Sequence, residues 1–373
     1  MPIPRMLYHT GFFYGGERKL TDENYMQTAL HLATQAKGQT SPNPAVGCVI
    51  VKHNRIVGLG THLRAGEAHA EIHALHMAGR DAEQATVYVT LEPCQHQGRT
   101  GACVDALLQA QVKRVVVATL DANPRVAGSG VKKLRDNGIE VIVGVCEREA
   151  QQINEAFFHY ITTKMPFVTL KQAISLDGKI SANKGQQTAI TGNIVQQDVH
   201  NARAEHDALL VGSQTILTDN PLLTNRLSAN KKQPIRIVID RQGLLPQHVN
   251  VIKDTTVPTW LFTTKSYSFT AHHVRVFLAN NWSLEDILTT IAQAGIMTLY
   301  VEGGQQIATS FIQQQLVQRY VLYIAPLLLG TGAVSMAATT THNQLRIKET
   351  ATLGNDIKIT MEVDTCSQGS LKN

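Results

Sequence analysis

The chain has 373 residues, enough for about two domains of ordinary size, and its 43% hydrophobic content allows each domain to bury a core. Its net charge of +5 comes from lysine and arginine residues scattered along the sequence, which argues against a basic tail for nucleic acid. Five cysteines are too few for a disulfide framework, and neither a secretory signal nor an apolar run of about 20 residues is visible, so we expect a cytoplasmic protein without a membrane span.

The first half of the chain alternates between helix and strand patterns. Residues 1–20 show no period and are assigned as an N-terminal extension without a function. Residues 21–38 predict a helix, because Thr21 or Asp22 can cap its start and Gly38 can end it. Two strands around a polar turn follow in 45–60, then strands in 85–90, 114–119 and 139–145 and helices near 69–79, 102–111 and 130–137. This alternation predicts a layered α/β domain over residues 21–146 with a largely parallel sheet.

A helix over residues 147–165 is predicted to link the two halves, and it ends before Pro166 because proline disfavours helical geometry in the preceding residue. A second α/β series occupies residues 166–373. Its strands are predicted in 167–175, 206–212, 234–240, 259–264, 297–304 and 319–330, and its helices near 192–204, 283–294 and 305–315. No repeat relates the two halves, so we expect two different folds.

His69, Cys94 and Cys103 form a candidate zinc site. A catalytic zinc ion takes three protein ligands of nitrogen or sulfur type and keeps a fourth position for water. Glu71, two residues after the histidine, is a candidate to carry the proton that this water releases. His69 and Cys103 open predicted helices and Cys94 follows a predicted strand, so loop-to-helix junctions can bring the three ligands together.

Each of these residues alone is ordinary, either a surface histidine or a small cysteine in a core. Together, His-Ala-Glu followed by Pro-Cys and a second cysteine matches the signature of zinc-dependent nucleobase deaminases. The usual signature has two residues between the cysteines, whereas the eight residues QHQGRTGA separate them here. The wide spacing argues against a generic cytidine or tRNA deaminase.

Four segments, TSPNPAVGCVIV, GTHLRAGEAHAEIHAL, TLEPCQHQGRT and DANPRVAGSG, closely resemble the deaminase half of the bifunctional riboflavin biosynthesis family RibD. The resemblance covers residues 21–146 and implies an α/β, cytidine-deaminase-like three-layer fold. It also implies one zinc ion and hydrolysis of the 2-amino group of 2,5-diamino-6-(5-phosphoribosylamino)pyrimidin-4(3H)-one. Asn43 would then hold the ring, while His62, His96 and Arg99 would lie toward the ribose phosphate, which a guanidinium can bind through two parallel hydrogen bonds.

The second half carries SLDGKI, HNARAEHDALLVGSQTILTDNPLLTNR, PIRIVID and LYVEGG, which resemble the reductase half of the same family, with a dihydrofolate-reductase-like fold. No G-x-G-x-x-G fingerprint marks a Rossmann site, but the glycine pair at 303 and 304 lies between a strand and a helix, where free N–H groups suit a phosphate. The resemblance implies that NADPH reduces the ribosyl side chain of 5-amino-6-(5-phosphoribosylamino)uracil to a ribityl chain.

The resemblance also implies site residues in the second half. Lys171 and Asp219 would lie near the reacting carbon. Arg203 and Arg226 would bind the substrate phosphate, unless they form ordinary surface ion pairs. The family more often has serine and tryptophan where Gln187 and Ala189 stand here, so nicotinamide packing at position 189 must differ. The cofactor contacts would be Ala173, Ala189, Thr215, Asp219, Gly304, Gln305, Gln306, Ile307, Ala308, Thr309 and Ser310, and the substrate contacts Gln187, Arg203, Leu223, Arg226 and Glu302.

Two other functions fit the sequence less well than this bifunctional enzyme. A nucleic-acid deaminase fused to a binding module would favour close cysteine spacing and a basic, aromatic-rich surface, whereas only 5% of the residues here are aromatic. A degenerate interaction protein would have lost a zinc ligand or Glu71, and none is lost. We therefore expect an enzyme that binds a phosphorylated pyrimidine, that binds no nucleic acid, and that forms a homo-oligomer.

Overall fold

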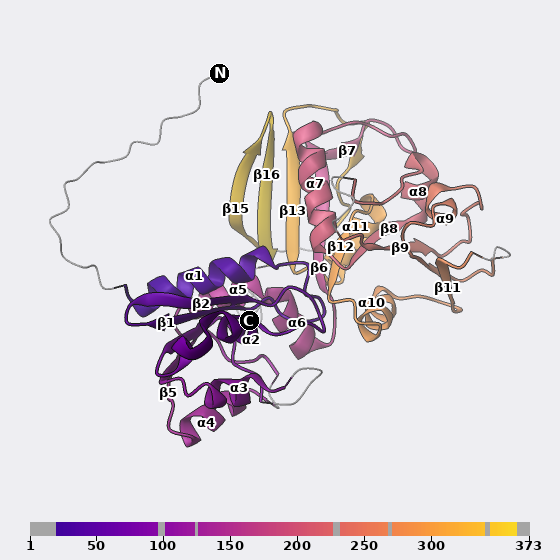
Figure 1. Cartoon of the computed structure of the whole chain (residues 1–373). Helices are drawn as coiled ribbons and strands as arrows, with labels where there is room; N and C mark the ends of the chain where they lie inside the picture. Colours follow the sequence, from indigo (N-terminus) through magenta and orange to yellow (C-terminus); the bar gives the residue numbers. More distant parts are fainter. Residues whose placement is uncertain are drawn as a thin grey trace, which may run out of the picture.

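The computed structural model describes residues 20–95, 101–123, 126–226, 232–267, 271–339 and 344–363. Two α/β halves lie one above the other in Figure 1, the first at lower left and the second at upper right. Within the part of the chain described, no helix combines the length and the apolar character needed to cross a membrane.

A five-stranded sheet in the order β2-β1-β3-β4-β5 forms the centre of the first half. β3, β4 and β5 are parallel, as predicted, but β1 runs antiparallel to both of its neighbours. The expectation of a largely parallel sheet was therefore wrong for β1 and β2, because His53 and Asn54 both adopt positive φ and close a tight hairpin between them. The strands are β1 (Gly47–Lys52), β2 (Arg55–Thr61), β3 (Thr86–Val89), β4 (Arg114–Val117) and β5 (Glu140–Val143).

Helices cover both faces of this sheet, which gives the three layers that the sequence predicted. Alternate side chains of β1 point to opposite faces, so that Cys48 and Ile50 join one core and Val49 and Val51 the other. One face packs against α1 (Asp22–Gln35), and the other against α2 (Ala70–Ala78), α3 (Cys103–Gln109) and α4 (Ser129–Asp136), with a short 3-10 turn η1 (Gly79–Ala82) after α2.

Close contact between β2 and α2 depends on Gly60. A Cβ atom at this position would lie 2.0 Å from the carbonyl oxygen of Ala70 and 2.6 Å from the amide nitrogen of Ala74. No side chain fits there, so the first turn of α2 lies directly on the backbone of β2.

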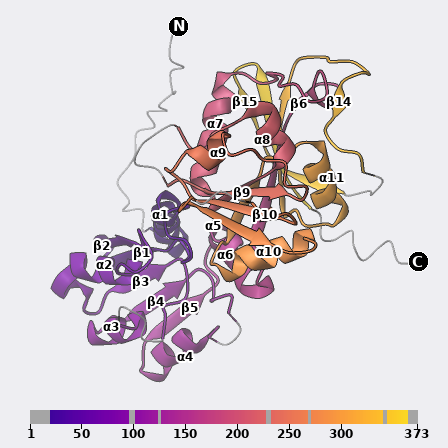
Figure 2. The ribbon, with the colours of Figure 1, turned by 90° about the vertical axis from the view of Figure 1, so that its right-hand side faces the viewer.

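The link between the halves consists of two helices, α5 (Glu147–Ile153) and α6 (Glu155–Thr163), rather than the single helix predicted. The chain leaves helical geometry at Asn154, whose φ is −104° and whose ψ is 19°. Both views place α5 and α6 between the two halves (Figures 1 and 2).

A nine-stranded sheet in the order β11-β10-β9-β8-β12-β6-β13-β16-β15 forms the second half, and β7 pairs with β14 beside it. The pairs from β11 to β13 are parallel, while β13, β16 and β15 are antiparallel. The strands are β6 (Phe167–Ser175), β7 (Lys179–Ser181), β8 (Ala208–Gly212), β9 (Ile235–Asp240), β10 (Thr259–Thr263), β11 (Val274–Leu278), β12 (Thr298–Val301), β13 (Arg319–Ala325), β14 (Val334–Ser335), β15 (Leu345–Leu353) and β16 (Asp356–Val363).

Two hydrophobic cores lie on opposite faces of the large sheet. The three predicted helices are present as α7 (Asn193–Glu205), α10 (Leu284–Gln293) and α11 (Gln305–Gln313). Five strands, β7, β11, β14, β15 and β16, and two short helices, α8 (Ser213–Asp219) and α9 (Asn250–Lys253), were not predicted.

Candidate functional site

The structure brings His69, Cys94 and Cys103 together in the first half. His69 caps the start of α2, Cys103 is the first residue of α3, and Cys94 lies in the loop after β3. The His69 Nδ1 atom lies 3.2 Å from the Cys103 sulfur and 3.5 Å from the Cys94 sulfur, and all three ligand atoms lie within 4.8 Å of one another. A tetrahedral zinc ion holds such atoms about 3.5 to 3.8 Å apart, given bond lengths of about 2.0 to 2.3 Å. One imidazole and two sulfurs at these separations therefore fit a zinc ion.

Hydrogen bonding prepares the Cys94 sulfur to be a thiolate ligand. The Cys103 thiol and the His69 imidazole both lie against it, and the backbone N–H of Cys103 donates to it over 3.4 Å. The Cys103 thiol and the His69 ring, together with this amide, lower the pKa of Cys94 below its usual range, although burial opposes them.

Glu71 lies in the first turn of α2 and is almost completely buried, with 3% of its surface exposed. Burial is the main reason that its pKa rises to about 7, because a carboxylate loses hydration in the protein interior. A carboxyl group with such a pKa can both accept and return a proton near neutral pH.

Asn43 and His62 lie beside the metal ligands. The Asn43 amide is 3.1 Å from His62 Nε2, and His62 Nδ1 is 3.1 Å from the carbonyl oxygen of Ala68. The His62 ring meets the His69 ring edge-on, with centroids 5.3 Å apart. Since both nitrogens of the buried His62 ring are engaged, this ring orients Asn43, and its role toward a ribose phosphate stays a prediction. The other two residues predicted near that phosphate, His96 and Arg99, lie outside the described residues.

Glu92, which sequence reasoning did not single out, joins the segment that leads to Cys94 to the start of α4. Its buried carboxylate accepts hydrogen bonds from the backbone N–H groups of Asp121, Gly128, Gly130 and Val131, at 2.8 to 3.2 Å. Because Glu92 stands two residues before Cys94, this anchoring also fixes the backbone that leads to the ligand. The sequence did offer a signal for this role, because Glu92 is an acidic residue directly after the apolar strand pattern of residues 85–91.

In the second half, Lys171, Arg203 and Glu302 meet on the face of the large sheet that α7 covers. The Arg203 guanidinium donates to both Glu302 oxygens over 2.7 and 2.9 Å and to the carbonyl oxygen of Thr224 over 3.1 Å. Burial would raise the pKa of Glu302, but Arg203 and then Lys171 hold it at about 2. Burial lowers the pKa of Lys171, whose ammonium group lies 5.9 Å from the Tyr323 ring. Arg203 is therefore bound to Glu302 in this structure, and its role toward a substrate phosphate stays a prediction.

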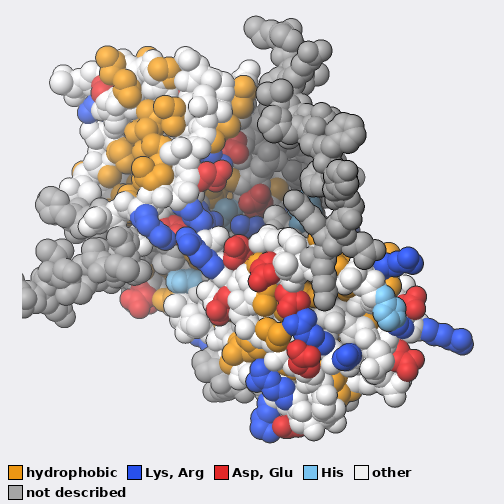
Figure 3. All heavy atoms as spheres, turned by 90° about the vertical axis from the view of Figure 1, so that its left-hand side faces the viewer, with side chains coloured by type: hydrophobic (Ala, Val, Ile, Leu, Met, Phe, Trp, Pro, Cys, Tyr) orange, Lys and Arg blue, Asp and Glu red, His pale blue; other side chains and the backbone are white. Residues whose placement is uncertain are grey.

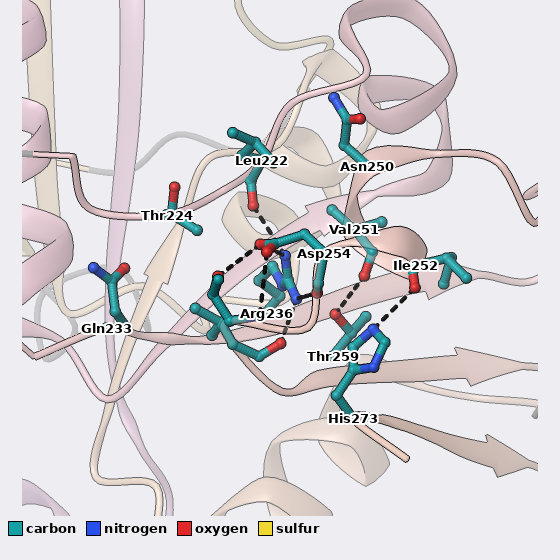
Figure 4. Close-up of polar contacts among 12 residues, drawn as sticks. Leu222, Thr224, Gln233, Arg236, Asn250, Val251, Ile252, Asp254, Thr259 and His273 are labelled. Atoms are coloured by element: carbon teal, nitrogen blue, oxygen red, sulfur yellow. Dashed lines mark hydrogen bonds and ion pairs between the residues drawn. The ribbon is translucent and has the colours of Figure 1, made fainter. Parts of the chain in front are cut away.

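Arg226 follows a loop that a buried arginine holds in place. Arg236 is fully buried, and it donates to the carbonyl oxygen of Leu222 over 3.3 Å and to the Asp254 carboxylate over 2.8 Å (Figure 4). The side chain of Leu223 packs in the core beside α7, so only its backbone remains for the predicted substrate contact. The guanidinium of Arg226 lies 3.3 Å from the ring of His200, a neighbour that sequence reasoning did not predict.

The predicted cofactor contacts lie on separate elements of the second half. Gly304 caps α11 after the carboxyl end of β12, and Thr215 and Asp219 belong to α8, which follows the adjacent parallel strand β8. Ligands bind at the carboxyl ends of parallel strands, where helix N-termini offer free N–H groups.

The predicted contacts on α11 differ in how accessible they are. Gly304, Gln305 and Gln306 form the start of this helix, where backbone N–H groups are free. Ala308 is fully buried, and the Thr309 hydroxyl accepts a hydrogen bond from Ala338 N at 2.9 Å. Ala173 lies in β6 and the exposed Gln187 and Ala189 in the loop before α7; Ile307 packs against Gly212, and Ser310 bonds to the Gln306 carbonyl.

Comparison with known proteins agrees with the division of the chain into two halves with separate sites. Residues 19–119 match the family model described as the cytidine and deoxycytidylate deaminase zinc-binding region, and residues 166–359 match the RibD C-terminal domain. The riboflavin biosynthesis protein RibD of Aquifex aeolicus is 44% identical, over 91% of this chain and 97% of its own length. The chain belongs to the RibD family. RibD of Escherichia coli K12 is 42% identical over 84% of this chain and 90% of its own length.

Solved RibD structures have the same fold over almost the whole chain. Acinetobacter baumannii RibD superposes with a TM-score of 0.87 at 37% identity, covering 92% of this chain and 99% of that one. A protein of Thermotoga maritima superposes with a TM-score of 0.85 at 34% identity, covering 92% of this chain and 99% of that one. That protein is described as a diaminohydroxyphosphoribosylaminopyrimidine deaminase and 5-amino-6-(5-phosphoribosylamino)uracil reductase. As a RibD protein, the chain is a bifunctional enzyme of riboflavin biosynthesis, with a zinc-binding deaminase half and a reductase half related to NADPH-dependent reductases.

Proposed function

We propose that the first half hydrolyses the 2-amino group of 2,5-diamino-6-(5-phosphoribosylamino)pyrimidin-4(3H)-one and releases ammonia. The second half then reduces the ribosyl side chain of 5-amino-6-(5-phosphoribosylamino)uracil with NADPH and forms 5-amino-6-(5-phosphoribitylamino)uracil. The observation that carries the first step is the cluster of His69, Cys94 and Cys103 with the buried carboxyl group of Glu71 beside it.

In the deaminase step, His69, Cys94 and Cys103 would hold the zinc ion, and Asn43 would hold the pyrimidine ring. Zinc bound there supplies a water molecule that loses its proton near neutral pH. Glu71 would accept this proton at its carboxylate and pass it to the substrate. The hydroxide left from the water would bond to C2 of the pyrimidine ring, and the bond from C2 to the amino nitrogen would break, which releases ammonia. The burial that raises the pKa of Glu71 suits it to both transfers.

In the reductase step, the open-chain imine of the substrate needs a hydride at carbon and a proton at nitrogen. NADPH supplies the hydride. The first turn of α11 binds a cofactor phosphate through its N–H groups, while Lys171 or Asp219 supplies the proton at the imine nitrogen. Lys171 is the better placed donor, because its ammonium is buried beside Glu302 and its lowered pKa eases release of the proton.

A homo-oligomer is supported by the edge of the large sheet. Among the described residues, β15 pairs with a strand on one side only, and Ile347 and Ile357 on the β15–β16 hairpin are 60% and 47% exposed. Hydrophobic side chains gather on the upper part of the face in Figure 3, where this edge lies. An unpaired edge and an apolar face of this kind are typical of sheet-to-sheet association between subunits. Light scattering that finds only monomers at micromolar concentration would contradict a homo-oligomer.

We also expect this protein in the cytoplasm.

The test is to mix the purified protein with the diamino pyrimidine phosphate and NADPH and to follow ammonia and NADPH together. Ammonia should appear first, NADPH should then be consumed in equal amount, and each chain should contain one zinc ion. An enzyme that releases no ammonia while it holds stoichiometric zinc would overturn the proposed substrate. NADPH should give a higher kcat/KM than NADH.

A further inference from the structure

The loop between α1 and β1 carries Asn43 and is held from the side of the interdomain link. Asn154, at the break between α5 and α6, accepts a hydrogen bond from Ala45 N with its Oδ1 atom and donates one to Ala45 O with its Nδ2 atom, both at 2.8 Å. The asparagine is 4% exposed, and Ala45 is also 4% exposed. One side-chain amide thus satisfies both backbone groups of a buried residue, which would otherwise be costly to leave unpaired.

The backbone around Asn154 is fixed from both directions. Its N–H donates to Ala150 O at 3.4 Å at the end of α5, and its carbonyl accepts from Phe158 N at 2.9 Å in α6. The next residue, Glu155, forms ion pairs with Arg319 of β13 and with Lys348 of β15. The docking of the second half on the link therefore sets the position from which Asn154 reaches Ala45.

A continuous set of contacts leads from Asn154 to the metal ligands. Ala45 stands two residues after Asn43, the Asn43 amide lies 3.1 Å from His62 Nε2, and the His62 ring lies edge-on against His69. The amide of Asn154 is used by Ala45, so it acts on the site through the loop and not on the substrate.

We propose that Asn154 is a positioning residue of the deaminase reaction, which holds the loop of residues 40–46 so that Asn43 meets the pyrimidine ring. This inference rests on the proposed function of Asn43 as a ring contact. Releasing the two hydrogen bonds leaves zinc and Glu71 in place but lets Asn43 move. The pyrimidine ring is then bound less tightly, and the loss of one hydrogen bond to it corresponds to about 10-fold in affinity.

The test compares Asn154→Ala, Asn43→Ala and the double variant with wild type and with Asn137→Ala. Asn137 is a matched control, because its amide donates to Lys133 O at the exposed end of α4. We expect Asn154→Ala to raise the KM for deamination about 10-fold or more, with a smaller change in kcat. Zinc content and the reduction of supplied 5-amino-6-(5-phosphoribosylamino)uracil should stay at wild-type values. Asn154→Ser, which keeps a hydrogen-bonding group, replaces the alanine variant if that protein does not fold.

The double variant separates positioning from general loosening. If Asn154 acts through Asn43, adding Asn154→Ala to Asn43→Ala should cause almost no further loss, whereas losses that multiply would overturn the proposal. Amide hydrogen exchange gives an answer that needs no substrate: exchange in residues 40–46 should rise at least 10-fold in Asn154→Ala and not in Asn137→Ala. Unchanged exchange, or an unchanged KM, would also overturn it. If wild type itself releases no ammonia, the proposed substrate is wrong, and hydrogen exchange still decides the role of Asn154.

Discussion

The guanidinium of Arg203 and the carboxylate of Glu302 form a bidentate ion pair at 2.7 and 2.9 Å, although 99 residues separate them in the sequence. Their side chains are only 13% and 10% exposed. Such a pair is costly to break on one side, because the remaining charge stays buried without its partner.

Glu302→Gln should therefore lower the free energy of unfolding by about 3 kcal/mol at pH 7. The folded-state pKa of Glu302, about 2, lies below the ordinary value of 4.5, so the contribution of its ionised form is complete above pH 4.5 and is lost as the pH falls toward 2. Urea unfolding between pH 6 and pH 3 should show that the free energy of unfolding falls less for Glu302→Gln than for wild type as the pH is lowered. Glu349→Gln, on exposed β15, is the control and should change stability by less than about 0.5 kcal/mol. Parallel pH curves for wild type and Glu302→Gln would contradict the assignment.

Glu71→Gln and Cys103→Ser should separate metal binding from proton transfer. Glu71→Gln should keep one zinc ion per chain and lose at least about 100-fold in deamination, because the amide cannot carry the proton. Cys103→Ser should lose zinc and deamination together. Both variants, and wild type treated with a chelator, should still reduce supplied 5-amino-6-(5-phosphoribosylamino)uracil. Metal analysis with the two separate assays checks this, and a chelator that stops NADPH oxidation would count against independent sites.

Gly303→Ala and Gly304→Ala should affect the second half in different ways. A Cβ at position 303 would lie 2.3 Å from Ile307 Cβ, so Gly303→Ala should lower the melting temperature. A Cβ at position 304 meets no protein atom within 4 Å, so Gly304→Ala should leave the melting temperature nearly unchanged. It should instead raise the KM for NADPH about 10-fold, because its methyl group would occupy the space of a bound phosphate. An unchanged KM would mean that the phosphate lies elsewhere.

Lys171→Met should reduce NADPH-dependent reduction by at least about 100-fold and leave ammonia release intact. Since burial lowers the pKa of Lys171, the protonated form disappears at a lower pH than for an exposed lysine. The wild-type reduction rate should accordingly fall as the pH rises, beginning below the usual lysine pKa of 10.5. Lys171→Arg should move this fall to higher pH. A rate that is independent of Lys171 would leave Asp219 as the proton donor.

Local patterns predicted the metal cluster, because His69, Cys94 and Cys103 each stand at the end of an element whose period is clear. The sequence analysis did not predict β15 and β16, although signals for both were present. β16 alternates strictly between polar and apolar residues from Asp356 to Val363, and Glu349 interrupts the same alternation in β15. Their two-residue connection, Gly354 and Asn355, was a further signal, since glycine at positive φ favours a tight hairpin.

Pairings between distant residues were not predictable from one sequence. Glu302 and Arg203 were each expected to contact substrate, and only the fold shows that they bind each other. Likewise, the helical pattern continued through residues 147–165, and only tertiary structure shows that Asn154 leaves the helix to bind Ala45. In both cases long-range contacts outweigh local propensity.

The contact at Gly60 has a consequence for engineering. Ala70, whose carbonyl oxygen touches this glycine, directly follows His69 and precedes Glu71. A methyl group added at position 60 would push the helix away from the strand and carry an imidazole and a carboxyl group with it. Mutational libraries of this enzyme should accordingly find position 60 as intolerant as the ligands themselves, although it contributes no chemical group to the reaction.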